Sequence, residues 1–309
     1  MIPKETLVVM PVYNAKPFVK KAIYSIISQT FTDFQFLIIN DGSTDGSGDE
    51  ICSVKDDRII VMDQTNRGLG SIINQAIQYA QKHKLKFLTR MDADDISLPN
   101  RLERQIDLLQ RNPNAAACSA NCYYINSMTE EIIGKSTVSN SPRLIRWEIN
   151  HGLRGLIHGA SIFRVDALNQ IDGYRPVFQH AEDVDLFLRL SERYDMINSK
   201  DFLYKIRLTP KSLSMSDVHQ SVLYQFYALN CAIQRRKGVG EQDFDVYKRN
   251  YNFLNRYKIW REEKFLELWR KGLVNHHPLY IFWAALVDLR RPFVRVLRQC
   301  PVNPLDHSS

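Results

Sequence analysis

The sequence FLTRMDADDISLPNRLERQ, residues 87–105, joins an apolar run to an acidic cluster and then to an amphipathic segment. The run predicts a buried strand, and apolar residues at helical spacing between 98 and 109 predict a helix. Asp92, Asp94 and Asp95 stand between them. Carboxylates this close repel one another, so a divalent metal, a basic side chain or plain solvent must lie among them.

The first hundred residues repeat this alternation of strand and helix. Strands are predicted at 6–13, 34–40, 58–64 and 85–92, and helices at 16–30, at 70–83 and after 95. Short connections between alternating elements imply right-handed crossovers, and hence an α/β fold with a mostly parallel sheet covered by helices on both faces. Ligands of such sheets bind outside the carboxyl ends of the strands, where both Asp-rich clusters, 40–47 and 91–95, are predicted to lie.

The composition, 44% hydrophobic and 24% charged, is that of an ordinary globular protein. Five cysteines without a C-x-x-C pair argue against a disulfide framework or a zinc site, and for a reducing compartment. We predict no secretory signal, because the N-terminus lacks a basic region followed by a long apolar core. No apolar run reaches the roughly 18 residues expected of a membrane-spanning helix.

The excess positive charge is concentrated at the C-terminal end of the sequence. The net charge is +7, and residues 235–309 hold 15 Lys and Arg against 8 Asp and Glu. Residues beyond 216 are predicted to be helical, whereas 115–215 contain short strand-like runs. Such a basic region could face nucleic acid or anionic lipid, or be a solvated helical face.

The acidic clusters could bind a metal ion, or they could serve only local structure such as a helix cap or a turn. Asp92 and Asp94 suit Mg²⁺, which takes one or two carboxylates and substrate phosphate oxygens. We predict instead that Asp95 caps the following helix. The spacing of segment 40–47 partly matches a calcium-binding loop. However, Cys52 occupies the position where such a loop has its bidentate acid, so 43–47 is predicted as a turn. Asp41 differs because it directly follows a buried strand.

A third acidic cluster, Glu182 and Asp183, precedes an amphipathic run in HAEDVDLFLRLSERY, residues 180–194. Acids at the start of a helix are favoured by the helix macrodipole. The alternative is a general base, a carboxylate placed to take a proton from an incoming hydroxyl.

Five ordered blocks resemble the family 2 glycosyltransferases, inverting enzymes with the GT-A fold. The blocks lie at 8–47, 66–77, 89–105, 159–176 and 182–190. The RMDADD and P.RL..Q motifs are most similar to those of bacterial enzymes of exopolysaccharide, capsule or O-antigen synthesis. The resemblance implies a Rossmann-like GT-A catalytic domain over 1–215 (a nucleotide-sugar-binding half, 1–110, and an acceptor-binding half, 111–215) and a basic helical C-terminal region over 216–309.

The resemblance also implies a donor site. Asp41 matches the acid that hydrogen-bonds the uracil ring, and Asp94 matches the last acid of the D-x-D element, which holds Mg²⁺ or Mn²⁺ against the diphosphate. Asp92 matches a position near the donor ribose. The other implied donor-binding residues are Pro11, Tyr13 and Asn14 around the base, Arg67 near the base and diphosphate, and Arg90.

On the acceptor side, Asp183 matches the catalytic base, with Glu182 and His158 beside the acceptor. One departure from the family pattern is Thr209, which replaces a histidine of the closing loop that can reach the metal or the diphosphate. This replacement keeps open an alternative function, that of a catalytically weak or dead relative acting as a nucleotide-sugar-binding scaffold subunit.

The implied function is metal-dependent transfer of a hexose or N-acetylhexosamine from a nucleotide sugar, expected to be a UDP-sugar, to a glycan or polyprenyl-diphosphate-linked acceptor. A dinucleotide-dependent oxidoreductase is disfavoured because no G-x-G-x-x-G follows the first strand. Nucleic acid is not an expected partner, because no recognition motif accompanies the basic region.

Residues 279–299 place an apolar stripe beside four arginines. This pattern suits a helix on an anionic membrane surface, and packing on the catalytic domain or in a homodimer is the alternative. We therefore expect a cytoplasmic enzyme, peripheral on the inner membrane if that helix binds lipid.

Overall fold

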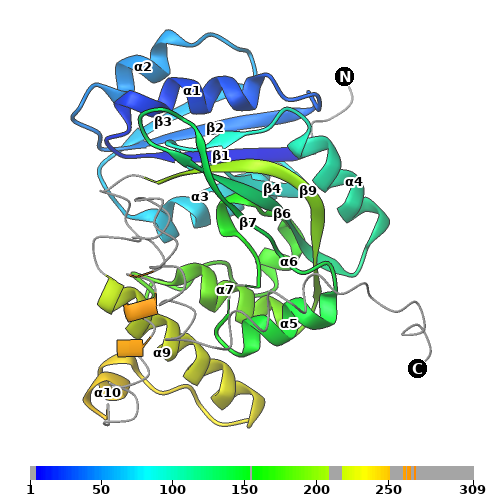
Figure 1. Ribbon diagram of the computed structural model, residues 1–309, viewed down its shortest axis with the longest axis vertical. Coiled ribbons are helices and arrows are strands. Elements are labelled where there is room, and N and C mark those ends of the chain that lie inside the picture. Colours follow the sequence, from blue (N-terminus) through cyan, green and yellow to red (C-terminus); the bar gives the residue numbers. More distant parts are fainter. Residues whose placement is uncertain are drawn as a thin grey trace.

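The computed structural model describes residues 5–153, 155–208, 218–250, 260–261, 263–265 and 268. They form one nine-stranded sheet with helices on both faces (Figure 1). The strands are β1 (Thr6–Val12), β2 (Phe34–Asp41), β3 (Ile59–Gln64), β4 (Phe87–Arg90), β5 (Ile96–Ser97), β6 (Ala115–Asn126), β7 (Ile132–Ser136), β8 (Ile162–Arg164) and β9 (Asp195–Leu208). The helices are α1 (Lys16–Ile27), α2 (Ser47–Ser53), α3 (Leu69–Lys82), α4 (Arg101–Arg111), α5 (Pro142–Asn150), the short 3₁₀ helix η1 (His158–Ala160), α6 (Val165–Asn169), α7 (Glu182–Ser191), α9 (Val218–Arg236) and α10 (Phe244–Arg249).

The sheet has a parallel half and a mixed half, in the order β3-β2-β1-β4-β8-β6-β9-β5, with β7 beside β6. The four strands from β3 to β4 are parallel, as the alternating pattern predicts. Beyond them β8 runs antiparallel to both β4 and β6, while β6 and β9 are parallel. The predicted α/β class is confirmed; the first half is wholly parallel, whereas the second half mixes parallel and antiparallel pairs.

The first half is buried on both sides of the sheet. Helices α1 and α2 cover one face and α3 the other (Figure 1). All of β1 is buried except Pro11, which is half-buried, because its residues contact helices in both directions. In α3 the predicted apolar face is the buried one: it comprises Ile72, Ile73, Ala76, Ile77 and Ala80.

The turn predicted at 43–47 joins two loops at the sheet edge. Asp45 accepts a hydrogen bond from the backbone N–H of Lys16 (2.9 Å), and Ser47 Oγ accepts one from that of Ala15 (2.9 Å). The turn therefore supplies acceptors for backbone N–H groups at the start of α1. Partial burial opposes ionisation of Asp45, but hydrogen bonds from Ser47 and Lys16 outweigh it and lower its pKa. The loop after β1 is therefore fixed.

The prediction that Asp95 caps the next helix is wrong. Two residues of β5 follow Asp95, because they pair antiparallel with β9, and α4 begins only at Arg101. Asp95 is buried, and its Oδ1 accepts the backbone N–H of Arg207 (2.8 Å). Its carboxylate therefore links the loop at residues 91–95, the acidic loop, to β9.

The second half extends to the C-terminal helices. Helix α7 lies between the sheet and α9 (Figure 1), and α9 packs on it. Tyr224, Tyr227 and Ala228 of α9 belong to the same buried cluster as β1. The domain boundary predicted at 215–216 and the segment 279–299 lie outside the described residues. Within the described ranges no helix combines the length and apolar character needed to cross a bilayer.

Candidate active site

The predicted donor residues lie at one edge of the parallel strands. Asp41 ends β2, Arg90 ends β4, and Tyr13 and Asn14 directly follow β1, which lies between them. The carboxyl ends of neighbouring parallel strands meet at one edge, where α/β proteins bind their ligands. The structure therefore brings together positions far apart in the sequence.

Asp41 is buried and organises the loop after β3. Its Oδ1 accepts from Gln64 Nε2 (2.7 Å) and from the backbone N–H of Arg67 (3.0 Å), and its Oδ2 accepts the N–H of Gly68 (3.3 Å). A carboxylate offers about four lone-pair directions, and these contacts use three of them. Asp41 can still accept one further donor, and the Arg67 side chain beside it is exposed.

The loop after β1 presents an aromatic ring next to Asp41. Tyr13 is 56% exposed, an unusual degree for an aromatic side chain at a sheet edge. Asn14 has a positive φ of 50° and is held by Ser43 Oγ (3.1 Å) and by the N–H of Thr44 (2.9 Å). These contacts hold the loop backbone beside Tyr13 at the sheet edge.

Arg90 is held between Asp92 and a buried histidine. Its guanidinium donates to Asp92 Oδ1 and to His158 Nδ1 (2.7 Å), while His158 Nε2 lies 2.6 Å from Tyr174 Oη. Burial and then the Arg90 charge push the pKa of His158 well below its usual range. A neutral His158 accepts from Arg90 at Nδ1 and donates to Tyr174 from Nε2. It thus positions Arg90, and its predicted place on the acceptor side stays a prediction.

Asp94 is a half-buried acid in the loop after β4. Burial and then repulsion by Asp92 raise its pKa to about 6, against the opposing attraction of Arg207 and Arg90. The loop is tightly packed: the Asp92 N–H donates to Tyr204 Oη (3.2 Å), and a Cβ on Gly159 would come within 3.0 Å of Asp92 Oδ2. Asp94 therefore has a fixed backbone and a carboxylate that a cation would stabilise.

Arg101, which was not predicted to belong to the site, is a fully buried cation beneath the acidic loop. Its guanidinium donates to Thr89 Oγ1 (2.8 Å) and to the Gly159 carbonyl (2.9 Å), and lies 4.6 Å from the Tyr204 ring centroid. A signal was present, because Arg101 and Gln105 occupy the inward-facing positions of the P.RL..Q block. Polar residues on a buried helical face indicate partners in the interior.

Arg207, near the end of β9 and two positions before Thr209, is a second buried cation at the acidic loop. The structure places it, buried, across the acidic loop: Nε donates to the Asp94 carbonyl (2.7 Å), and Nη2 donates to Glu130 Oε1 (2.8 Å). Glu130 also pairs with Lys21 of α1. Arg207 thus fixes the backbone that carries Asp94.

The third acidic cluster faces the same site. Glu182 and Asp183 open α7 immediately after Ala181, whose φ is positive (53°). Burial, then repulsion by Asp183, raises the pKa of Glu182 to about 7, while attraction by Arg90 opposes the shift. Because Arg90 and Asp92 influence Glu182, the start of α7 lies near the loop that carries Asp92.

The acids fit a metal that is completed by substrate oxygens. Within the described part of the chain, no three His, Cys, Asp or Glu side chains are grouped to hold an ion by themselves. Mg²⁺ and similar hard cations are commonly held by one or two carboxylates plus substrate phosphates. The half-buried carboxylate of Asp94, with its raised pKa, is a suitable single ligand.

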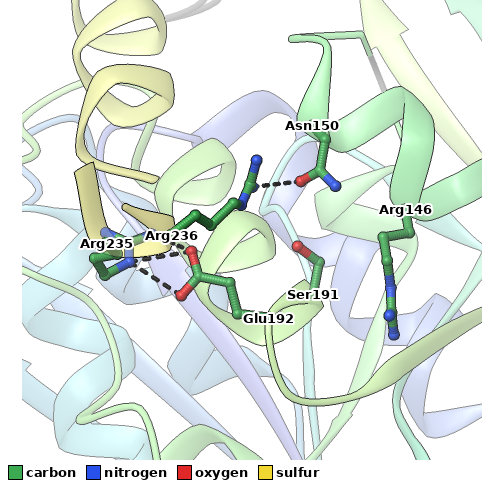
Figure 2. Close-up of a pocket in the computed structure, with 6 residues that line it drawn as sticks. All are labelled: Arg146, Asn150, Ser191, Glu192, Arg235 and Arg236. Atoms are coloured by element: carbon green, nitrogen blue, oxygen red, sulfur yellow. Dashed lines mark hydrogen bonds and ion pairs between the residues drawn. The ribbon is translucent and has the colours of Figure 1, made fainter. Parts of the chain in front are cut away.

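A separate hollow lies at α5, the end of α7 and the end of α9 (Figure 2). Its three arginines are engaged, because Arg235 pairs with Glu192, Arg236 donates to Asn150 Oδ1 (2.6 Å) and Arg146 pairs with Asp195 (3.0 Å). None of the predicted site residues lines it. The lining residues are Arg146, Asn150, Ser191, Glu192, Arg235 and Arg236.

Comparisons with known proteins show the family of this chain. A family model described as Glycosyl transferase family 2 matches residues 7–172, more than half of the chain. The chain is 28% identical over 210 residues to the Escherichia coli UDP-Glc:alpha-D-GlcNAc-diphosphoundecaprenol beta-1,3-glucosyltransferase WfgD, covering 67% of this chain and 78% of WfgD.

Two solved structures share the fold at 15% sequence identity. Staphylococcus aureus TarS in complex with UDP-GlcNAc has a TM-score of 0.57, with 96% of this chain and 92% of TarS covered. The Pyrobaculum calidifontis mannosyltransferase PcManGT, in complex with GDP-Man and Mn²⁺, has a TM-score of 0.56, with 94% and 83% covered. The predicted GT-A fold is thereby confirmed.

Proposed function

Since this chain belongs to glycosyl transferase family 2 and is therefore a glycosyltransferase, we propose that it transfers a hexose or N-acetylhexosamine from a UDP-sugar to a glycan or lipid-linked glycan in bacterial surface polysaccharide synthesis. The proposal is supported by the placement of Asp41 and Arg90 at the carboxyl ends of β2 and β4, and by the influence of Arg90 and Asp92 on Glu182 at the start of α7. A UDP-sugar donor and a lipid-linked acceptor are suggested by what WfgD's name states of that protein.

On the donor side, the base would lie against the exposed Tyr13 ring and donate its imide N–H to Asp41. Asp41 keeps one free lone-pair direction for such a donor. Arg67 extends beside this place and would attract the diphosphate. Pro11 and Asn14 would complete the base pocket, and Asp92, with Arg90, would lie near the ribose.

Asp94 would hold Mg²⁺ or Mn²⁺ at the diphosphate. A bound divalent ion neutralises charge that develops on the leaving nucleoside diphosphate. The protein's own contribution is the placement of the carboxylate, which Arg207 and Asp95 fix through the loop backbone. The PcManGT structure with Mn²⁺ supports such an ion in this fold.

On the acceptor side, Asp183 would accept the proton of the acceptor hydroxyl as its oxygen attacks the anomeric carbon. The bond to the diphosphate breaks on the opposite face, so the configuration inverts. Glu182, with a pKa of about 7, would accept or donate a hydrogen bond at the acceptor, depending on its protonation.

Protection against thermal unfolding tests the donor class. UDP-glucose, UDP-galactose and their N-acetyl forms, each with Mn²⁺, are compared with GDP-mannose, with transfer assayed in parallel. At a hundred times its Kd, a true donor stabilises the fold by about 2.7 kcal/mol, equivalent to a Tm rise of about 4 °C. Protection by GDP-mannose alone would refute the UDP assignment. Protection without turnover for any acceptor would favour the alternative, a nucleotide-sugar-binding scaffold.

We also propose that the enzyme works on the cytoplasmic face of the inner membrane through residues 279–299. The support is the sequence pattern alone, four arginines beside an apolar stripe. Flotation with anionic liposomes should retain the full chain and lose a form ending at Gly272. If neither form floats, packing of the segment on the enzyme or in a homodimer replaces the membrane proposal.

A further inference from the structure

The helix that carries Glu182 and Asp183 is held by a buried carboxylate, Asp185. This side chain is 1% exposed and lies in the first turn of α7. Arg189 of the same helix donates to Asp185 Oδ2 (2.8 Å from Nε), and its Nη2 donates to the Gly173 carbonyl (2.7 Å). A buried carboxylate requires such paired donors, because an unpaired charge in the interior is strongly unfavourable.

Arg175 is the second partner of Asp185 and comes from a loop outside α7. Its Nη2 donates to Asp185 Oδ1, and its Nε donates to Asp185 Oδ2 (3.1 Å), so the pair is bidentate. The other edge of the same guanidinium, at Nη1, pairs with Glu241. The guanidinium also lies 4.8 Å from the Phe178 ring centroid. Arg175 is therefore held between α7 and Glu241.

Glu241 belongs to the C-terminal helical part of the chain, between α9 and α10. Its second oxygen accepts from Arg235 of α9 (2.6 Å). The ring of Phe178 lies 5.3 Å from that of Tyr227, also on α9. One continuous set of contacts thus joins the first turn of α7 to the C-terminal helices.

We propose that Arg175 is a positioning residue that couples the acceptor-side acids of α7 to the C-terminal helices, with Glu241 setting its position. The inference rests on the proposed function for the roles of Glu182 and Asp183. Asp185 lies two residues beyond Asp183 in the same helical turn, so a shift of the Asp185–Arg175 pair moves the base. A displacement of about 1 Å can lower a rate by about a hundredfold.

The neighbouring residue, Tyr174, separates the donor side from this link. Tyr174 bonds His158, which holds Arg90, while its backbone is fixed by Asn74 (2.8 Å at both the N–H and the carbonyl). Because Asn74 of α3 fixes Tyr174, the donor-side chain through His158 stays in place when Arg175 shifts. The acceptor step should therefore be affected and donor binding spared.

Glu241→Gln and Glu192→Gln form a matched pair of variants. Both carboxylates bind Arg235 and are similarly exposed, 25% and 24%, but only Glu241 also binds Arg175 (Figure 2 shows the Glu192–Arg235 pair). We expect Glu241→Gln to lower kcat about tenfold, with the donor KM and the Kd for UDP and Mn²⁺ changed by less than about twofold. Glu192→Gln should keep kcat within about twofold of the wild type.

Arg175→Lys and Arg175→Gln test the same link from its centre. A lysine keeps the charge but cannot bridge Asp185 and Glu241 with a planar fork, so kcat should lie between those of the wild type and Arg175→Gln. Amide hydrogen exchange gives a readout that needs no substrate. The N–H groups of Val184 and Asp185 donate to the Ala181 carbonyl (3.1 and 3.2 Å), and their exchange should quicken in Glu241→Gln but not in Glu192→Gln.

Three results would overturn the inference: equal loss of kcat in both glutamate variants, a parallel rise in the donor KM, or faster exchange at Val184 with kcat unchanged. A wild-type protein that transfers no sugar would instead refute the proposed function. In that case the exchange comparison still decides whether Glu241 orders the first turn of α7.

Discussion

Replacing Asp94 with Asn is expected to lower metal-dependent sugar transfer about a thousandfold while leaving the fold intact. Loss of a ligand that holds a Lewis-acid ion removes several kcal/mol of charge stabilisation, and each 1.36 kcal/mol is a factor of ten. The fold should persist because repulsion by Asp92 helps to raise the pKa of Asp94, and removing one charge relieves that repulsion. Turnover with Mg²⁺ or Mn²⁺ and Tm in the absence of metal are the two measurements.

Asp107→Asn is the control, since it is the same chemical change on α4 away from the site, at a pair with Arg111. Full activity of Asp94→Asn with either ion would exclude Asp94 as the ligand.

The pH dependence of metal affinity gives a second check on Asp94. Because the pKa of Asp94 is about 6, a proton competes with the metal below about pH 6, and the apparent metal affinity of the wild type should fall there by up to about tenfold per unit.

Asp183→Asn should abolish transfer but preserve donor binding. A general base contributes about a hundred- to ten-thousandfold to a rate, and the amide of asparagine cannot take up the hydroxyl proton. The base acts on the acceptor and not on the nucleotide, so the Kd for UDP with Mn²⁺ should change by less than about twofold. Isothermal titration beside a transfer assay measures both quantities.

The control for Asp183→Asn is Asp166→Asn, an exposed acid in the first turn of α6. It separates loss of the base from loss of a carboxylate that favours a helix start. If UDP binding weakened as much as transfer, Asp183 would belong to the donor site and another residue would be the base.

Local sequence pattern was sufficient for the parallel half of the fold. The strand and helix periods between residues 6 and 83 correspond to β1 to β3, α1 and α3, and the predicted buried face of α3 is the observed one. These elements follow from periodicity because their burial is set by near neighbours in sequence. The family resemblance added the order of blocks, and with it the GT-A fold.

Periodicity failed at Asp95, where a distant strand decided the local structure. Residues 96–97 pair with Lys205 and Tyr204, more than 100 positions away, and so remain extended. The same distance hid the role of Arg207, which reaches the backbone of Asp94 and Asp95 from β9. A single sequence contains no register between such segments.

The sequence by itself determined which side chains carry charge at the strand ends, and that Asp41, Asp94 and Asp183 lie in three separate blocks. Only the tertiary structure decided what surrounds them: a buried Arg101 under the acidic loop, a neutral His158 behind Arg90, and an Asp185–Arg175–Glu241 link behind α7. The physical reason is that the pKa and orientation of a carboxylate depend on burial and on partners within a few ångströms. Several of those partners, such as His158 for Arg90 and Glu241 for Arg175, come from segments more than 60 residues distant, which meet only when the chain folds.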